Sequence, residues 1–308
     1  MADRRWAKLA MLHVIEATYG TDAVPTAADA IIATNVTFTP IEAEEIKRDL
    51  MLPYIGNQGS ILAAEYGRIE FEVEMAGAGA AGDVPRYGSL LRVCGLSETV
   101  TAGVQVDYEI IEDNVESGTF YFNSDGVQHI FLGNQANLSI SVVPKDIPKF
   151  RFTVMGLLGD VTDVALPAVT NSAWIDPVKV SKAHTTMTLH GWSAVAESLS
   201  IDLGNTLTPR FLIGEEKIKI TNRSTTGTAV IVARHVADFD LFGKVKSRAR
   251  DALAVTQGIT AGNIVDVSGP ALEFGKPTQG QTDGIVNYST PLSFCPVTGM
   301  DELKITVR

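Results

Sequence analysis

The sequence predicts a mainly β protein in two similar halves, each carrying one short helix. Three observations lead to this prediction. Short segments alternate apolar and polar residues, Gly, Asn, Asp and Pro separate these segments, and only two stretches have a helical pattern. At 308 residues the chain is long enough for one large or two modest domains.

Residues 68–75 carry the clearest strand pattern. They alternate apolar Ile69, Phe71, Val73 and Met75 with acidic Glu70, Glu72 and Glu74, so each set falls on one face of a strand. Further strands are expected at residues 104–111, 119–123, 128–132, 137–143, 149–154, 198–203, 217–221, 228–234, 264–267, 284–289 and 303–307. Asp125-Gly126 lies between two of them and is a typical hairpin turn.

Two short helices are expected. Residues 87–94 allow two turns closed by Gly95. In residues 238–249, Asp238 can cap the N-terminus, and Leu241, Phe242 and Val245 share a face.

The two halves resemble each other. Thr101-Ala102-Gly103 reappears as Thr260-Ala261-Gly262, about 159 positions later (260 − 101), and the same shift lays residues 68–75 over 227–234. We expect an N-terminal domain at 1–165, a linker at 166–183 and a C-terminal domain at 184–308. The first domain would add a long arm at about 39–60 and a hairpin near 119–132. The alternative is coincidence, because Thr-Ala-Gly is a common turn tripeptide.

Composition excludes several classes. A formal net charge of −11 argues against a protein that wraps nucleic acid, which needs clustered Lys and Arg. No run of about 18 apolar residues is present, so no membrane span is expected. The N-terminus lacks the pattern of a signal peptide, which favours synthesis in the cytoplasm. Cys94 and Cys295 are expected to be free thiols rather than a disulfide, given their apolar neighbours.

The loop Gly77-Ala78-Gly79-Ala80-Ala81-Gly82 matches the dinucleotide pattern G-x-G-x-x-G. The strand before it alternates acidic and apolar residues, whereas a Rossmann strand is apolar throughout. Pro85 follows closely and prevents a helix from starting at the glycines. We therefore expect no cofactor, and interpret Gly77, Gly79 and Gly82 as a flexible loop that orders against a neighbouring subunit.

No pattern for catalysis or metal binding stands out. His184 and His190 would lie ~20 Å apart on an extended strand, too far to share a metal. Neither a C-x-x-C pair nor a G-x-S-x-G nucleophile motif occurs. The sequence therefore predicts no catalytic residue, no metal site and no enzyme activity.

Several segments, in order along the chain, resemble a known family. They are Leu-His-Val-Ile-Glu-Ala-Thr-Tyr-Gly-Thr-Asp at 12–22, Tyr-Ile-Gly-Asn at 54–57, Tyr-Gly-Ser-Leu-Leu-Arg-Val-Cys-Gly at 87–95, Glu-Ser-Leu-Ser-Ile-Asp-Leu-Gly-Asn at 197–205, Ile-Thr-Ala-Gly-Asn-Ile-Val at 259–265 and Asp-Glu-Leu-Lys-Ile-Thr-Val at 301–307. Together they are similar to the major tail tube proteins of long-tailed bacteriophages, over nearly the whole chain.

This resemblance implies two tandem tail-tube-like β-sandwich or barrel domains, each with a short flanking helix. It implies a structural virion protein that assembles in the host cytoplasm into stacked rings, forming a tail tube for genome delivery. The implied partners are further copies of itself, the tape measure, tail terminator and distal tail proteins, and double-stranded DNA in transit, with no membrane. Two domains per chain favour a trimeric, pseudo-hexameric ring, and a true hexamer is the alternative.

In a tube, two segments would gain roles. Glu70, Glu72 and Glu74 would either line the lumen and repel DNA or face the outside of the tube. The arm, with Glu42, Glu45, Arg48, Met51, Leu52 and Tyr54, would pack against an adjacent ring or fold back on its own domain.

Two other classes remain open. A β-sandwich adhesin or carbohydrate-binding module usually exposes aromatic platforms, whereas Trp6, Trp174 and Trp192 are dispersed along this sequence. An enzyme is the third possibility, and geometry alone could reveal its catalytic residues.

Overall fold

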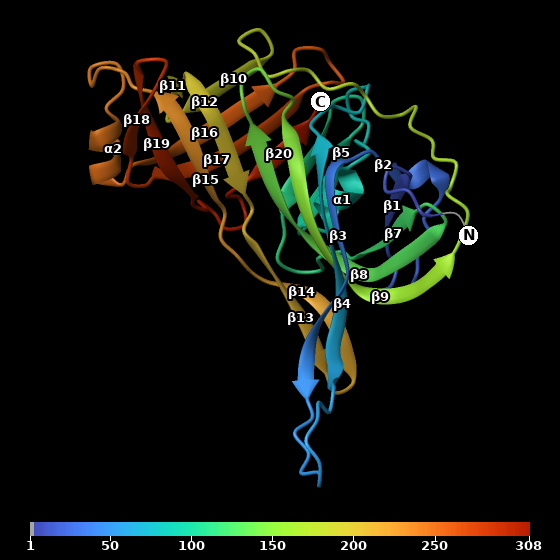
Figure 1. Ribbon diagram of the computed structural model, residues 1–308. Helices are drawn as coiled ribbons and strands as arrows, with labels where there is room; N and C mark the ends of the chain where they lie inside the picture. The colour runs from blue at the N-terminus through green and yellow to red at the C-terminus, as the bar shows by residue number, and fades with distance from the viewer. Residues whose placement is uncertain (1–2) are drawn as a thin grey trace.

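The computed structural model describes residues 3–308 and is mainly β, as predicted (Figure 1). The first half contains β1 (Leu9–Ile15), β2 (Ala30–Ile31), β3 (Thr34–Lys47), β4 (Ser60–Glu74), α1 (Gly88–Arg92), β5 (Leu96–Thr101), β6 (Gln105–Ile110), β7 (Gly118–Ser124), β8 (Val127–Val142) and β9 (Lys149–Asp163). The second half contains β10 (Thr185–Leu189), β11 (Trp192–Ser193), β12 (Ala196–Asp202), β13 (Asn205–Leu212), β14 (Glu215–Arg223), β15 (Thr226–Val232), α2 (Leu241–Ser247), β16 (Arg250–Gln257), β17 (Val265–Phe274), β18 (Thr278–Thr282), β19 (Ile285–Phe294) and β20 (Lys304–Val307).

One antiparallel layer runs through both halves without a break. Its strand order is β3–β4–β9–β8–β12–β15–β19–β18. The halves meet where β8 pairs with β12, with Leu199 opposite Val142 and Ile201 opposite Ile140. The order β3–β4–β9–β8 in the first half corresponds to β12–β15–β19–β18 in the second.

A second antiparallel layer covers the first. Its order is β5–β6–β20–β17–β16–β10–β11, so the C-terminal strand β20 is inserted between β6 of the first half and β17 of the second. Strands β1, β2 and β7 form an additional group that joins the first half of β8.

The core between the layers follows from strand alternation. Ile69, Phe71 and Val73 of β4 are at most 1% exposed and face the core, as their spacing predicts. Phe150 and Phe152 of β9 pack beside them. Buried apolar residues form one continuous cluster through both halves, which therefore share a core.

Both helices are present, one in each half, but shorter than predicted. Helix α2 begins after Asp240, whose side chain accepts a hydrogen bond from Gly243 N, so Asp238 is not the cap. Leu241, Phe242 and Val245 were expected to share a face, but Leu241 is buried whereas Phe242 is 42% exposed and meets Tyr288 edge-on.

The proposed internal repeat needs one correction. A shift of 159 matches buried Val106 to buried Val265. The same shift puts buried Ile69 on Thr228, which faces away from the core beside buried Ala229. If β4 corresponds to β15, the number of residues between this strand and the Thr-Ala-Gly turn differs by an odd number in the two halves. A single shift therefore cannot align both the strand and the turn.

The predicted linker, residues 166–183, has no regular secondary structure and is tied to both halves. Trp174 Nε1 donates to Ala30 O at 3.1 Å, and Gln257 Nε2 donates to Val178 O at 2.5 Å. The domain boundaries on either side of it stay a prediction.

Candidate assembly surfaces

The first layer ends in two strands that each have one unpaired edge among the described residues. Strand β18 reads Thr-Gln-Gly-Gln-Thr, and all five residues are exposed. Monomeric β proteins usually protect such an edge with charge, proline or a covering segment. Strand β18 carries no charged residue and no proline. At the other end, β3 pairs with β4 alone.

We call the side of the first layer that faces away from the core the polar face. Near β4 it carries Glu70, whose carboxylate is bonded to Arg68 and, at 2.6 Å, to Arg151. The hydrogen bond from Arg151 lowers the pKa of Glu70. Lys149 Nζ bonds Glu72 at 3.0 Å. Glu74 lies on the same side, next in the alternation.

Farther along, the polar face is rich in hydroxyl groups. It carries Ser139 and Ser141 on β8, Ser198, Ser200 and Asp202 on β12, Thr226 and Thr228 on β15, and Ser289 and Ser293 on β19. Counting both regions, five acids (Glu70, Glu72, Glu74, Glu197 and Asp202) face three bases (Arg68, Lys149 and Arg151). The three glutamates therefore do share a face, but three cations on it leave only a mild negative charge.

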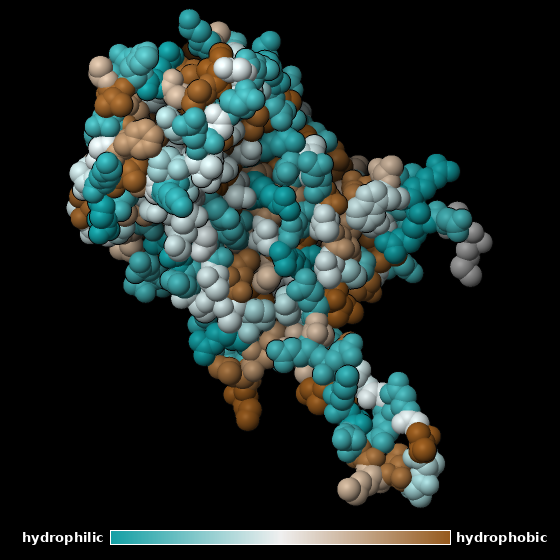
Figure 2. Space-filling model, turned by 60° about the vertical axis from the view of Figure 1, so that its left-hand side comes forward, coloured by the Kyte–Doolittle hydropathy of each residue, from teal (hydrophilic) through white to brown (hydrophobic). Residues whose placement is uncertain are grey.

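Two hairpins project from the same end of the molecule (Figure 1). The longer one, here called the arm, consists of the outer parts of β3 and β4 and the loop between them. The shorter one is β13–β14, which includes Leu212 and Ile213 at its tip. Both tips are apolar in Figure 2.

The predicted arm residues lie along this projection. Met51 is 104% exposed, Tyr54 67% and Leu52 39%, and neighbouring Ile55 is 106% exposed. Arg48 is exposed near the tip, while Glu42 and Glu45 lie on β3. The arm does not fold back on its own domain, and its apolar tip lacks a cover among the described residues.

The glycine loop contacts the other half of the same chain. Gly77 N donates to Asn263 Oδ1 at 2.7 Å, and Gly79 N donates to Gly262 O at 2.8 Å. A Cβ at Gly82 would lie 2.4 Å from Gly103 N, so this glycine packs on the equivalent turn of its own half. Contact with a neighbouring subunit stays a prediction for these glycines.

Residues 6–294 match the family model described as phage tail tube protein. The chain belongs to this family. No curated protein matches this tail tube protein. Its family makes it a structural component of a phage virion, and an adhesin or carbohydrate-binding module is not favoured.

Within residues 3–308 no group of three or more His, Cys, Asp and Glu side chains is placed to hold a metal ion. Cys94 and Cys295 are free thiols, as predicted. None of the helices described in residues 3–308 has the length and apolarity needed to cross a membrane.

Sequence reasoning missed two buried polar centres that organise the first half. Glu16 accepts four hydrogen bonds, from Gly20 N, Ser117 Oγ, Thr119 Oγ1 and Gly133 N. His13 contacts Ser89 Oγ through Nδ1 at 2.9 Å and Asn134 Oδ1 through Nε2 at 3.2 Å. Apart from Gly20, the partners are distant in sequence, so no local motif could have revealed these centres.

Proposed function

We propose that three copies of this tail tube protein close into a ring by pairing β18 of one chain with β3 of the next, and that the rings stack into the tube through which the genome passes. The observation that carries this proposal is the β8–β12 junction. Strands β8 and β18 hold equivalent places in the two halves, as do β12 and β3. A β18–β3 contact between chains would therefore repeat a junction that the chain already makes internally.

The strand count favours three chains over six. Three chains give 24 strands (3 × 8), which at a spacing of ~4.8 Å close into a cylinder about 37 Å across at the backbone. Side chains of roughly 5 Å on each wall leave about 27 Å, enough for a duplex of roughly 20 Å. Six chains would give 48 strands (6 × 8) and, by the same arithmetic, a bore of about 63 Å, about three times the width of the duplex. A true hexamer is therefore the less favoured alternative.

In such a ring the polar face lines the channel, because the second layer covers the opposite face. Glu70, Glu72 and Glu74 then face the lumen, with Glu70 paired to Arg68 and Arg151 and Glu72 paired to Lys149. DNA would meet hydroxyl groups and a mildly negative charge. Without a cluster of unpaired cations, the wall offers phosphates little to bind.

The remaining partners follow from this arrangement. The arm would contact an adjacent ring, the tape measure protein would occupy the channel before DNA, and tail terminator and distal tail proteins would close the two ends. Ring assembly would take place in the host cytoplasm.

Blocking the open edge tests ring closure. The paired substitution Thr278→Lys and Gln279→Lys places two charges on β18, whose side chains make no hydrogen bond at these positions among the described residues. We expect a folded monomer by circular dichroism and light scattering, with no rings in negative-stain micrographs. Thr186→Lys with Thr188→Lys, on β10 between two partners, is the matched control and should still form rings. Rings of the β18 variant with normal threefold symmetry would contradict the proposal.

A further inference from the structure

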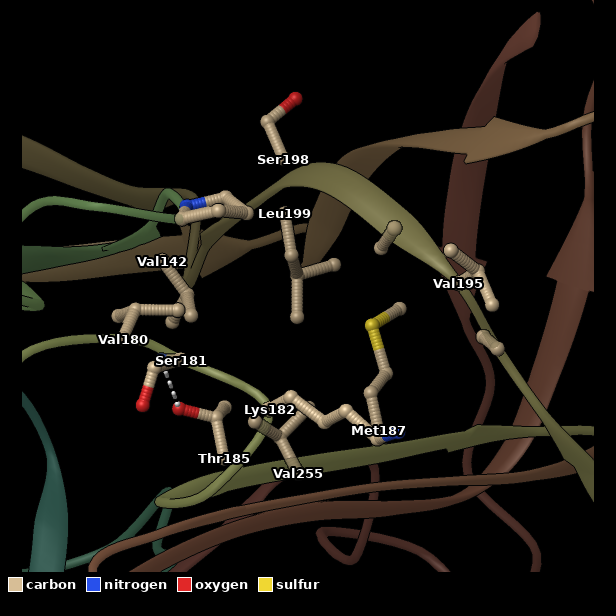
Figure 3. A pocket seen from close by; sticks show the side chains of 13 residues that line it. Val142, Val180, Ser181, Lys182, Thr185, Met187, Val195, Ser198, Leu199 and Val255 are labelled. Atoms are coloured by element: carbon tan, nitrogen blue, oxygen red, sulfur yellow. Dashed lines mark hydrogen bonds between the residues drawn. The ribbon is translucent and has the colours of Figure 1, made fainter.

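An apolar cavity of about 340 Å³ lies at the junction of the two halves (Figure 3). Val142 of β8, Leu199 of β12 and Met187 of β10 point toward one another across it, and Val180 and Val255 complete its apolar lining. Its volume corresponds to roughly eleven water molecules at ~30 Å³ each. Water in a cavity lined mainly by apolar groups makes few hydrogen bonds, so an apolar occupant would displace it favourably.

The cavity and the arm lie at opposite ends of the first layer. Strand β4 runs from Ser60, in the arm, to Glu74, which is opposite Lys149 of β9. Lys149 is opposite Ser141, and the next residue, Val142, lines the cavity. The 15 residues of β4 span about 50 Å, so the arm of one chain cannot reach its own cavity.

We propose that this cavity receives the arm tip of another copy of the chain, in the adjacent ring, with Met51 and Ile55 as the inserted side chains. These two residues are fully exposed at the end of the longer projection. A projection at one end and a receptor at the other make a head-to-tail contact, which repeats without closing and generates a filament. This inference rests on the proposed ring assembly and adds the receptor site for stacking.

Disulfide trapping tests the contact in the full chain. Ile55→Cys and Val195→Cys, in a Cys295→Ser background, place one thiol on the arm tip and one at the cavity, which Val195 lines at 46% exposure. Oxidised tubes should give a ladder of linked chains on a non-reducing gel. Stacked rings without a ladder would overturn this inference alone, whereas a chain that forms no rings would overturn the proposed function as well.

A matched pair of variants separates the two projections. Met51→Ser with Ile55→Ser should leave rings intact and lower the amount of sedimentable tube at least ten-fold. Leu212→Ser with Ile213→Ser, at the tip of β13–β14, should lower it less than two-fold. Filling the cavity with Ala194→Phe should have the same effect as the arm variant. The reverse order, with stacking lost only in the β13–β14 variant, would assign the contact to the shorter hairpin and overturn the proposal.

Discussion

Gly79 N donates a 2.8 Å hydrogen bond to Gly262 O, which joins the loop after β4 to the Thr-Ala-Gly turn of the other half. Neighbouring Gly77 is packed so closely that a Cβ would lie 2.1 Å from the same carbonyl oxygen. The two halves therefore meet backbone to backbone at this point, where a methyl group does not fit.

Gly77→Ala should destabilise the protein by about 1–3 kcal/mol, because the turn that carries Gly262 must move away from the added methyl group. Urea unfolding followed by circular dichroism measures the change. Gly56→Ala is the control, since a Cβ at Gly56 meets no atom within 4 Å. Equal stability of the two variants would show that the contact between the halves is loose.

Glu16→Gln should also destabilise the fold by about 1–3 kcal/mol. The carboxylate accepts two hydrogen bonds on each oxygen, and an amide would turn one NH₂ group toward two donors. Thermal unfolding of this variant can be compared with Glu112→Gln, whose side chain is 67% exposed and should have little effect. A stable Glu16→Gln protein would mean that the surrounding loops rearrange at low cost.

His13 should make stability depend on pH. Burial lowers the pKa of His13 from 6.5 to about 4, so the folded protein holds the neutral ring. The unfolded chain binds more protons between these values, so the contribution is fully present above pH 6.5 and lost as pH falls toward about 4. The difference corresponds to about 3 kcal/mol.

The measurement is the free energy of unfolding at pH 7 and at pH 4.5. The native chain should lose more stability than His13→Gln over this interval, whereas His235→Gln, at an exposed position, should behave like the native chain. An identical pH dependence of all three proteins would rule out the role of His13.

Ser200→Lys with Ser293→Lys should leave ring assembly intact and impair genome delivery. Both serines are exposed on the polar face outside the ion pairs, so the substitutions add cations without breaking a charged contact. Added cations on the channel wall would bind phosphates and slow DNA passage. Phage that carry this variant should show at least ten-fold lower infectivity, with Ser200→Asn and Ser293→Asn as neutral controls. Unchanged infectivity would place this face away from the DNA.

The strands were predictable wherever one face is buried and the other is solvated. In β4, the alternation of Ile69, Phe71 and Val73 with acids predicts which side of the strand faces the core. The turn between β7 and β8 was predicted from the Asp125-Gly126 pair. The family could also be recognised from short segments in order along the chain.

What the sequence left open depends on contacts between distant residues. The cations that neutralise Glu70 include Arg151, on a strand that pairs with β4 from 81 positions away. Glu16 accepts hydrogen bonds from Gly20, from Ser117 and Thr119 at the start of β7, and from Gly133 in β8. Gly77 is constrained by a turn in the other half. The outer arm was expected as a segment, but only the structure places it opposite the junction cavity.

The uncharged Thr-Gln-Gly-Gln-Thr edge of β18 has a consequence for the timing of assembly. In a newly made chain, the exposed edge of β18 could pair with any extended segment. Uncontrolled polymerisation would then be limited by the slow formation of the first ring. Growth would then start from a nucleus and proceed quickly once that nucleus exists. We therefore expect a lag phase in solutions of the purified chain, shortened sharply by seeding with preformed rings.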